Sequence, residues 1–171
     1  GGISGRVEAT GRGVQFGLRE FFRNKNDVKL AKLDGSLNGK RVIVQGFGNV
    51  GYHAALFLSE EDNAKITTVI ERDGVIYNEN GINIRDLKNH MIDTGGTIGF
   101  EGYNKPNTKF LFNDCEILIP AAMEGVITKE NANLVKANLI IEAANGPITY
   151  EADKILEQNG VVIIPDMYAN A

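Results

Sequence analysis

Three glycines at fixed spacing follow an apolar run in the stretch KRVIVQGFGNVGYHAALFLS, residues 40–59. In GFGNVG, Gly46 permits a tight turn, Gly48 leaves room for an anion to approach the main chain, and Gly51 allows close packing of the following segment. These roles are typical of a turn that binds the pyrophosphate of a dinucleotide. Glycine makes up 20 of the 171 residues, so the hexapeptide alone is also compatible with a plain packing turn.

The surroundings of the motif favour the dinucleotide interpretation. An apolar strand precedes it, a helix is expected from Asn49 to Glu60, and the next strand, ITTVI, ends at Glu71. An acid about 20 residues beyond the glycines is where a carboxylate accepts hydrogen bonds from the adenosine ribose diol. The turn and first helical turn also contain Phe47 and Val50, and free N–H groups there suit a phosphate. We therefore predict cofactor contacts along residues 46–51 and at position 71.

The residues that end this strand also bear on the choice of cofactor. The carboxylate of Glu71 repels a 2′-phosphate and favours NAD. Arg72 follows it, and a guanidinium there could pair with a 2′-phosphate, although the simpler interpretation is a solvated residue in the turn ERDG. The prediction is NAD, with NADP as the alternative.

The elements that must position this turn alternate along the chain. A leading helix is predicted from Ser4, as its cap, to about Lys25, because apolar residues and a glycine recur there at helical spacing. Strands and helices then take turns to the end of the chain. The expected segments are VIVQ, helix 49–60, ITTVI, helix 83–94, EILIP, helix 128–136, LIIEAA, helix 149–159 and VVIIP.

Short, continuously apolar strands of this kind belong to a parallel sheet that is covered by helices on both faces. The fold class predicted is α/β, a Rossmann-like doubly wound domain over residues 1–171. Residues 95–113 are expected to form a surface loop. The three later helices are expected to begin at capping side chains, with acids in their first turns. The caps are Asn83, Thr128 and Thr149, and the acids are Asp86, Glu130 and Glu151.

Composition narrows the classes of function. The net charge is −4 and the 18 basic residues are scattered, which offers no footprint for nucleic acid or for an anionic membrane. Neither partner is expected. Cys115 is interpreted as a buried strand residue, and His53 and His90 as helix residues without a catalytic role. No metal site is predicted, because no HExxH or paired-cysteine spacing occurs.

The chain resembles the nucleotide-binding domain of glutamate dehydrogenases, within the glutamate, leucine, phenylalanine and valine dehydrogenase group. The resemblance runs from end to end. It rests on GRVEATGRGV, VQGFGNVG, the acid in IERDG, ILIPAA, EAANGPIT and IPDMYANA, in that order.

The resemblance implies NAD(P)-dependent oxidative deamination of L-glutamate to 2-oxoglutarate and ammonia. It also implies roles for single residues. Thr10 and Asn170 would contact the nicotinamide amide, and Arg6 would approach a substrate carboxylate. Ala121, Ala122 and Asn145 would line the cofactor cleft at strand ends. The alternatives are a mid-helix hydroxyl for Thr10, a loop residue for Asn170 and a surface helix arginine for Arg6.

The family's catalytic lysine and acid belong to a separate substrate domain, and neither is found here; the pairs Gly1-Gly2 and Gly95-Gly96 lack the expected following lysine. No catalytic residue is therefore predicted in this chain. Because it begins with glycine and ends at PDMYANA, we interpret it as an excised part that binds dinucleotide and turns over little or nothing. For the intact enzyme the resemblance implies a homo-hexamer, and its chemistry suggests a cytoplasmic protein or one of the mitochondrial matrix.

Two alternatives stay open. The first is another amino-acid dehydrogenase, of the leucine or valine type, because the substrate pocket would lie mainly outside this chain. The second is a free-standing dinucleotide-binding module without catalysis, such as a sensor or regulatory subunit.

Overall fold

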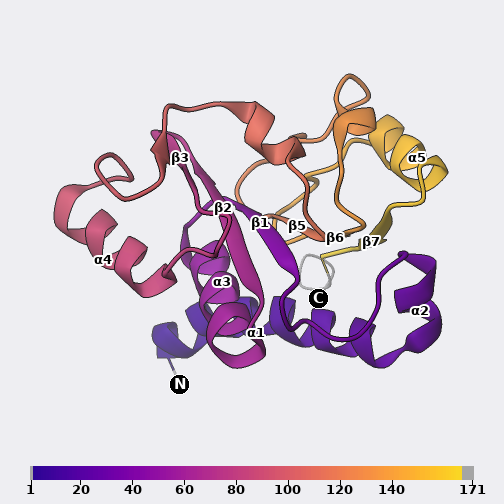
Figure 1. Cartoon of the computed structure of the whole chain (residues 1–171), viewed down its shortest axis with the longest axis horizontal. Helices are drawn as coiled ribbons and strands as arrows, with labels where there is room; N and C mark the ends of the chain where they lie inside the picture. Colours follow the sequence, from indigo (N-terminus) through magenta and orange to yellow (C-terminus); the bar gives the residue numbers. More distant parts are fainter. Residues whose placement is uncertain (1, 167–171) are drawn as a thin grey trace.

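The computed structural model describes residues 2–166, with side chains from residue 8 onward (Figure 1). Within this range seven strands form one sheet in the order β4-β3-β2-β1-β5-β6-β7. The strands are β1 (Arg41–Gln45), β2 (Lys65–Glu71), β3 (Gly74–Tyr77), β4 (Tyr103–Asn104), β5 (Ile117–Pro120), β6 (Leu139–Ile141) and β7 (Val162–Ile164).

Five α-helices and two 3₁₀ helices accompany the sheet in the described range (Figure 1). They are α1 (Gly2–Arg23), α2 (Lys25–Leu30), α3 (Asn49–Asp62), α4 (Ile84–Thr94), α5 (Tyr150–Gln158), η1 (Thr108–Phe112) and η2 (Ala132–Leu134).

The sheet is parallel except at one edge. Strand β1 lies between β2 and β5 and pairs with both in parallel, and β6 and β7 continue that direction. Strands β3 and β4 add an antiparallel edge beyond β2. The chain leaves β1 for β2 on one side and later returns to β5 on the other, so the order reverses at the carboxyl ends of β1 and β5. The predicted mixed α/β architecture with a mostly parallel sheet is confirmed.

Both faces of the central strands are covered. Successive strand residues point to opposite faces, and Val44 packs into a core cluster with Leu18 of α1 and Leu58 of α3. Its neighbour Ile43 belongs to a second cluster, which includes Leu156 of α5. Burial on two sides explains why these strands are continuously apolar rather than alternating.

Two of the three predicted helix caps are confirmed. The Asn83 side chain accepts a hydrogen bond from the Asp86 N–H at 3.0 Å, where α4 begins. The Thr149 hydroxyl accepts from the Ala152 N–H at 3.3 Å, where α5 begins. In both helices an acid lies in the first turn, as expected from the helix dipole.

The third predicted helix, over residues 128–136, is wrong. Only the short η2 forms there. The Asn131 carboxamide accepts a hydrogen bond from the Thr128 N–H at 2.8 Å and donates one to the Val126 carbonyl at 3.1 Å. A side chain that takes over backbone hydrogen bonds in this way offers the chain an alternative to the helix. Glu130 therefore lies in a turn and not in the first turn of an α-helix.

The leading helix also differs at its ends. It begins at Gly2, so Ser4 lies inside the helix and is not its cap. It ends at Arg23 because the Asn24 side chain accepts hydrogen bonds from the N–H groups of Asn26 and Asp27, at 3.1 and 3.3 Å, and starts α2 instead.

The expected surface loop, residues 95–113, is more ordered than its composition suggested, since it contains β4 and η1. The Asp73 carboxylate accepts hydrogen bonds from the Thr97 N–H and hydroxyl, both at 2.8 Å. The Tyr103 hydroxyl donates to the Asp73 carbonyl at 2.9 Å. These contacts fasten the segment to the turn between β2 and β3.

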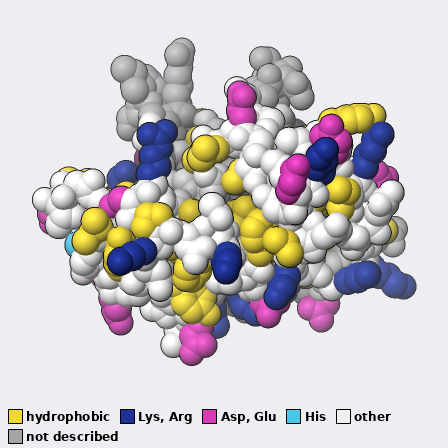
Figure 2. All heavy atoms as spheres, turned by 90° about the horizontal axis from the view of Figure 1, so that it is seen from above, with side chains coloured by type: hydrophobic (Ala, Val, Ile, Leu, Met, Phe, Trp, Pro, Cys, Tyr) yellow, Lys and Arg dark blue, Asp and Glu magenta, His cyan; other side chains and the backbone are white. Residues whose placement is uncertain are grey.

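The surface mixes charges of both signs. On the face seen in Figure 2, lysine and arginine side chains are interspersed with aspartate and glutamate, and apolar side chains lie between them. Within residues 2–166, no helix has the length and apolar character needed to span a membrane.

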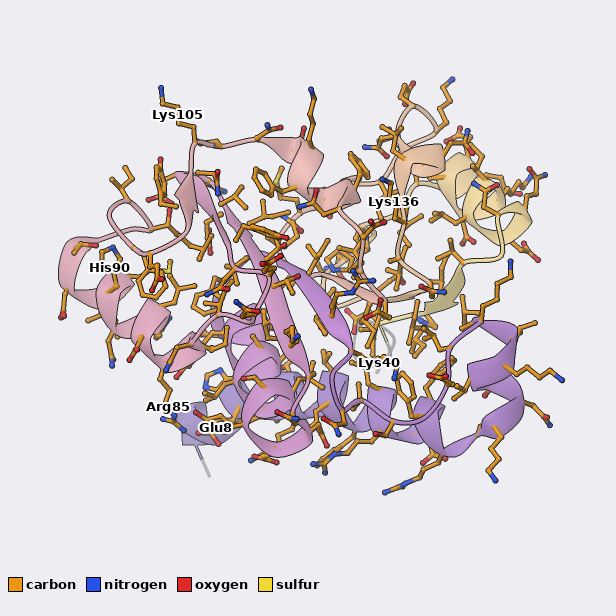
Figure 3. All side chains as sticks on the ribbon, in the orientation of Figure 1. Glu8, Lys40, Arg85, His90, Lys105 and Lys136 are labelled. Atoms are coloured by element: carbon orange, nitrogen blue, oxygen red, sulfur yellow. The ribbon has the colours of Figure 1, made fainter. Side chains whose placement is uncertain are left out.

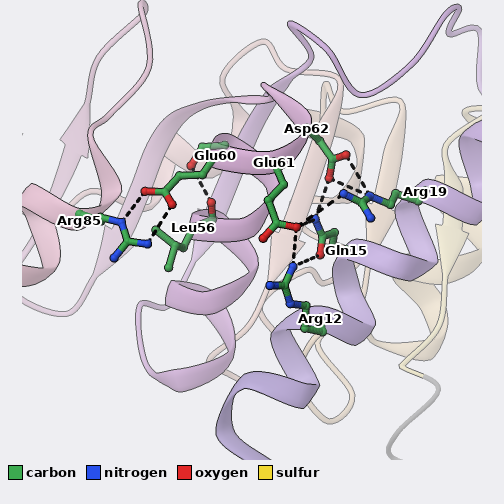
Figure 4. Close-up of polar contacts among 9 residues, drawn as sticks. Arg12, Gln15, Arg19, Leu56, Glu60, Glu61, Asp62 and Arg85 are labelled. Carbon is green, nitrogen blue, oxygen red and sulfur yellow. Dashed lines mark hydrogen bonds and ion pairs between the residues drawn. The ribbon is translucent and has the colours of Figure 1, made fainter. Parts of the chain in front are cut away.

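A polar cluster joins α1 to α3 (Figure 4). Arg12 Nη1 donates to Glu61 Oε1 at 2.6 Å, and the buried Gln15 Nε2 donates to Asp62 Oδ2 at 2.9 Å. Arg19 Nε donates to Asp62 Oδ1 at 3.0 Å. Three consecutive turns of α1 are thus tied to the last turn of α3.

We expect the contribution of Glu61 to stability to depend on pH. The hydrogen bond from Arg12 lowers the pKa of Glu61 below its usual value of 4.5. A carboxyl with a lowered pKa in the folded state stabilises the fold above the unfolded-state pKa, and this contribution is lost as the pH falls through the folded pKa. Since the pair is about one-third exposed, Glu61→Gln should cost about 0.5 kcal/mol at pH 7.

The measurement is urea unfolding of both chains between pH 7 and pH 4. The difference between them should shrink toward zero at the acid end. Glu79→Gln, in an exposed turn after β3, is the matched control. A cost for Glu61→Gln that stays constant with pH would show that the charge of Glu61 has no role in the cluster.

Candidate functional site

The glycine turn after β1 is shaped by two contacts that exclude a side chain. Gly46 has φ of +96°, and a Cβ atom there would collide with the Cβ of Ala122. A Cβ atom on Gly51 would collide with the Gly46 carbonyl oxygen. The first glycine therefore allows the turn, and the third brings α3 directly onto it.

The middle glycine has a different environment. Gly48 is exposed, has φ of −75°, and a Cβ atom placed on it would meet nothing within 4 Å. It is also the N-cap of α3, and it provides no capping side chain. The first N–H groups of α3, at the exposed Asn49 and the partly buried Val50, thus lie beside open space at the positive end of the helix dipole.

The acid at the end of β2 is joined to this turn. The Phe47 N–H donates to Glu71 Oε1 at 2.6 Å, which holds the turn and the β2 end together through one of the two carboxylate oxygens. The Phe47 side chain is buried and packs edge-on against Tyr52, with ring centroids 5.5 Å apart. Only the main chain of Phe47 therefore faces the site. Arg72 comes next and is exposed.

A pocket of about 370 Å³ lies at the carboxyl ends of β1, β2 and β5, bordered by η1. Gly46, Glu71, Arg72 and Ala122 all line it, so the structure brings these four predicted residues together. Ala121 does not line this pocket; it lies between the end of β5 and Ala122, and its N–H donates to the Gln45 carbonyl at 2.7 Å.

A larger hollow of about 810 Å³ lies between α1 and the ends of β6 and β7. Of the predicted residues, Thr10 lines it. The position of Thr10 relative to α3 is fixed by packing. Its neighbour Gly11 lies so close to α3 that a Cβ atom there would collide with His53. Asn145 is exposed in the turn after β6 and lines neither hollow.

Two predicted residues lie outside the part of the chain that the structure describes. They are the side chain of Arg6 and the whole of Asn170.

Two polar residues at strand ends were not predicted. Gln45 ends β1, is only 7% exposed and lines the smaller pocket. Its Oε1 has no hydrogen-bond partner among the described residues. Glu142 follows β6 and lines the larger hollow, where burial raises its pKa. The available signal was a polar side chain that closes an otherwise apolar strand.

The remaining reactive side chains have structural environments. His53 Nδ1 lies 2.7 Å from the Asn49 carbonyl on the same helix. His90 lies on α4, where Figure 3 labels it, and its Nε2 is 2.8 Å from the Ile98 carbonyl. Cys115 is buried, as predicted, and burial raises the pKa of its thiol to about 12. Among the described residues no group of three His, Cys, Asp or Glu side chains could hold a metal ion.

Comparison with protein families gives a match over the whole chain. The model of the family described as Glutamate/Leucine/Phenylalanine/Valine dehydrogenase matches residues 1–171. A probable glutamate dehydrogenase of Sinorhizobium fredii is 51% identical over all of this chain and 39% of its own length. An NADP-specific glutamate dehydrogenase of Saccharolobus shibatae is 45% identical, over 38% of its length. The chain thus spans little more than a third of these relatives.

Solved structures of the same kind share the fold. Glutamate dehydrogenase from Peptoniphilus asaccharolyticus aligns with a TM-score of 0.74 and 33% identity, over 97% of this chain and 36% of its own. The hetero-hexameric glutamate dehydrogenase from Thermus thermophilus aligns with a TM-score of 0.78 and 27% identity, over 94% of this chain and 36% of its own.

The glycine contacts predict a contrast between two alanine variants. In Gly51→Ala the new methyl group collides with the main chain of the turn, and overpacking of about 1–3 kcal/mol should exceed the roughly 1 kcal/mol that alanine gains in a helix. In Gly48→Ala the methyl group enters open space, so the change should stay below about 1 kcal/mol. Urea unfolding of both variants measures the difference. Equal stability of the two would contradict the close packing of α3 on the turn.

Proposed function

We propose, from the premise that this chain belongs to the Glutamate/Leucine/Phenylalanine/Valine dehydrogenase family, that it is the dinucleotide-binding domain of a glutamate dehydrogenase. The domain is then Rossmann-like and doubly wound, and it spans residues 1–171. In the intact enzyme it would serve the oxidative deamination of L-glutamate to 2-oxoglutarate and ammonia. The names of the relatives support this choice over a leucine or valine enzyme.

The observation that carries the proposal is the hydrogen bond between the Phe47 N–H and Glu71, beside the open space over Gly48. The turn and the acid are thereby held at one place, where the strand order reverses. Open-sheet domains bind their ligands at such a point. This site fits a dinucleotide, since it combines the first N–H groups of α3, which no side chain of the N-cap residue caps, the open space over Gly48 and the carboxylate of Glu71 at the pocket.

Each part of this site has a proposed task. The exposed turn at Gly48, with Asn49 and Val50 at the start of α3, would bind the pyrophosphate through main-chain N–H groups. Glu71 would accept hydrogen bonds from the adenosine ribose diol. Ala122 would leave room for the base.

A second group of residues would orient the nicotinamide. Thr10 would contact its amide from α1, and Asn170 would approach from the other side. Ala121 and Asn145 would border the cleft at the ends of β5 and β6. Arg6 would reach a substrate carboxylate.

When bound, NAD⁺ supplies the acceptor for a hydride from the substrate α-carbon. This chain's own residues bind and orient that acceptor, and the proton transfers would belong to a lysine and an acid of the separate substrate domain. The 171-residue chain alone is therefore proposed to bind dinucleotide with little or no turnover. We propose a homo-hexamer for the intact enzyme, in the cytoplasm or the mitochondrial matrix.

The proposal gives a first prediction for binding. Gly48→Ala should weaken NADH binding by about tenfold or more, because the methyl group enters the space that the pyrophosphate needs, although the variant stays folded. Calorimetric titration of the wild-type chain and of Gly48→Ala measures this. A folded wild-type chain that binds neither NADH nor NADPH would overturn the proposed function.

A second prediction concerns the choice of cofactor. Wild-type chain should bind NADH more tightly than NADPH, because the Glu71 carboxylate repels a 2′-phosphate. Glu71→Gln should narrow that preference by about tenfold, since it removes the charge but keeps a carbonyl that can accept from the Phe47 N–H. Arg72→Ala should weaken NADPH more than NADH. An unchanged ratio of the two affinities in Glu71→Gln would rule out Glu71 as the selecting group.

A further inference from the structure

Gln45 has an environment that the turn motif does not explain. It is 7% exposed at the end of β1, and its side-chain Oε1 is buried without a hydrogen-bond partner among the described residues. Its main-chain carbonyl is used in the sheet, where it accepts from the Ala121 N–H. A buried amide carbonyl that lacks a donor destabilises a fold by about 1–3 kcal/mol, so this oxygen can still accept a hydrogen bond from a group beyond the described residues.

The position of Gln45 distinguishes it from the other buried oxygen in this state. Thr68 Oγ1 also lacks a partner within the described residues, but it lies in the middle of β2 and lines neither of the two pockets described above. Gln45 lines the pocket of about 370 Å³ at the strand ends. That volume falls in the range of small-molecule sites.

The walls of this pocket suit a flat, largely apolar group with one polar edge. Ile70, Leu111, Phe112 and Val126 supply apolar lining, and Gln45 is the buried amide among them. Glu71 lies at the same pocket, where we have placed the ribose diol. The group next to that ribose in a dinucleotide is its purine base.

We propose that the side-chain carbonyl of Gln45 accepts a hydrogen bond from the exocyclic amino group of the purine base, so that the site selects adenine. This inference rests on the proposed dinucleotide site. The ribose hydroxyls are matched by Glu71, which leaves the amino group as the N–H donor of the adenine ring itself. With the Gln45 carboxamide in the orientation that the structure shows, a base with a carbonyl at that ring position would place two acceptors against each other.

The test is a comparison of two ligands on two chains. NADH and its hypoxanthine analogue differ at the position of the amino group, which the analogue replaces by oxygen. We expect the wild-type chain to bind NADH about tenfold more tightly than the analogue, and Gln45→Met to bind the two almost equally. Methionine has a similar length and no amide, and calorimetry gives both affinities.

Two results would overturn the inference. One is equal affinity of the wild-type chain for the two ligands. The other is a loss of affinity in Gln45→Met that is the same for both ligands, as expected of a residue that only shapes the pocket. If Gln45→Met does not fold, Gln45→Asn serves instead, because it withdraws the carbonyl by one methylene and should also narrow the preference. Glu71→Gln is the control that should weaken both ligands alike.

Failure of the inference can be told apart from failure of the proposed function. A wild-type chain that binds NADH without discriminating against the analogue refutes the role of Gln45 alone. A folded wild-type chain that binds neither ligand refutes the dinucleotide site and the role of Gln45 with it.

Discussion

The contact between Gly51 and the carbonyl of Gly46 is the constraint on which the other elements depend. Because no side chain separates them, the start of α3 lies directly over the end of the central strand. The same helix also contacts α1 closely, because Gly11 has no side chain and lies against the Cβ of His53. These two close contacts thus define the positions of β1, α3 and α1 relative to one another. The polar cluster at the other end of α3 adds hydrogen bonds that hold the two helices together there.

The carboxyl ends of β1, β2 and β5 bring together residues from distant parts of the sequence, and each of these residues is held by its own contact. Glu71 is tied to the turn by the Phe47 N–H, and Ala122 is pressed against Gly46. The turn that follows β2 is held by the two hydrogen bonds that Thr97 donates to the Asp73 carboxylate. Because each part of this site is held by contacts within the chain, the proposed binding would need little further ordering.

Much of this architecture could be predicted because it depends on local patterns. Apolar runs marked the parallel strands, and the capping side chains of Asn83 and Thr149 marked two helix starts. The same argument failed at Thr128, where Asn131 competes for the backbone, a choice that depends on one side chain's partners. Strand β4 has only two residues, and β3 follows β2 after a turn of two residues, so neither was predicted as a separate strand. Gln45 could not be predicted as a site residue, because the argument for it depends on its burial and on a missing hydrogen-bond partner, which the sequence does not display.

The bond between Glu71 and Phe47 has a consequence for how such a protein could change over evolutionary time. One side chain is proposed to select the cofactor and also holds the turn in place. A mutation at position 71 that alters selectivity would disturb the turn in the same step, unless the new residue kept an acceptor for the Phe47 N–H. Arg72 is exposed, so exchanges there encounter no such conflict. The easier mutational route between the two cofactors therefore runs through position 72, with position 71 following once the turn has acquired another support.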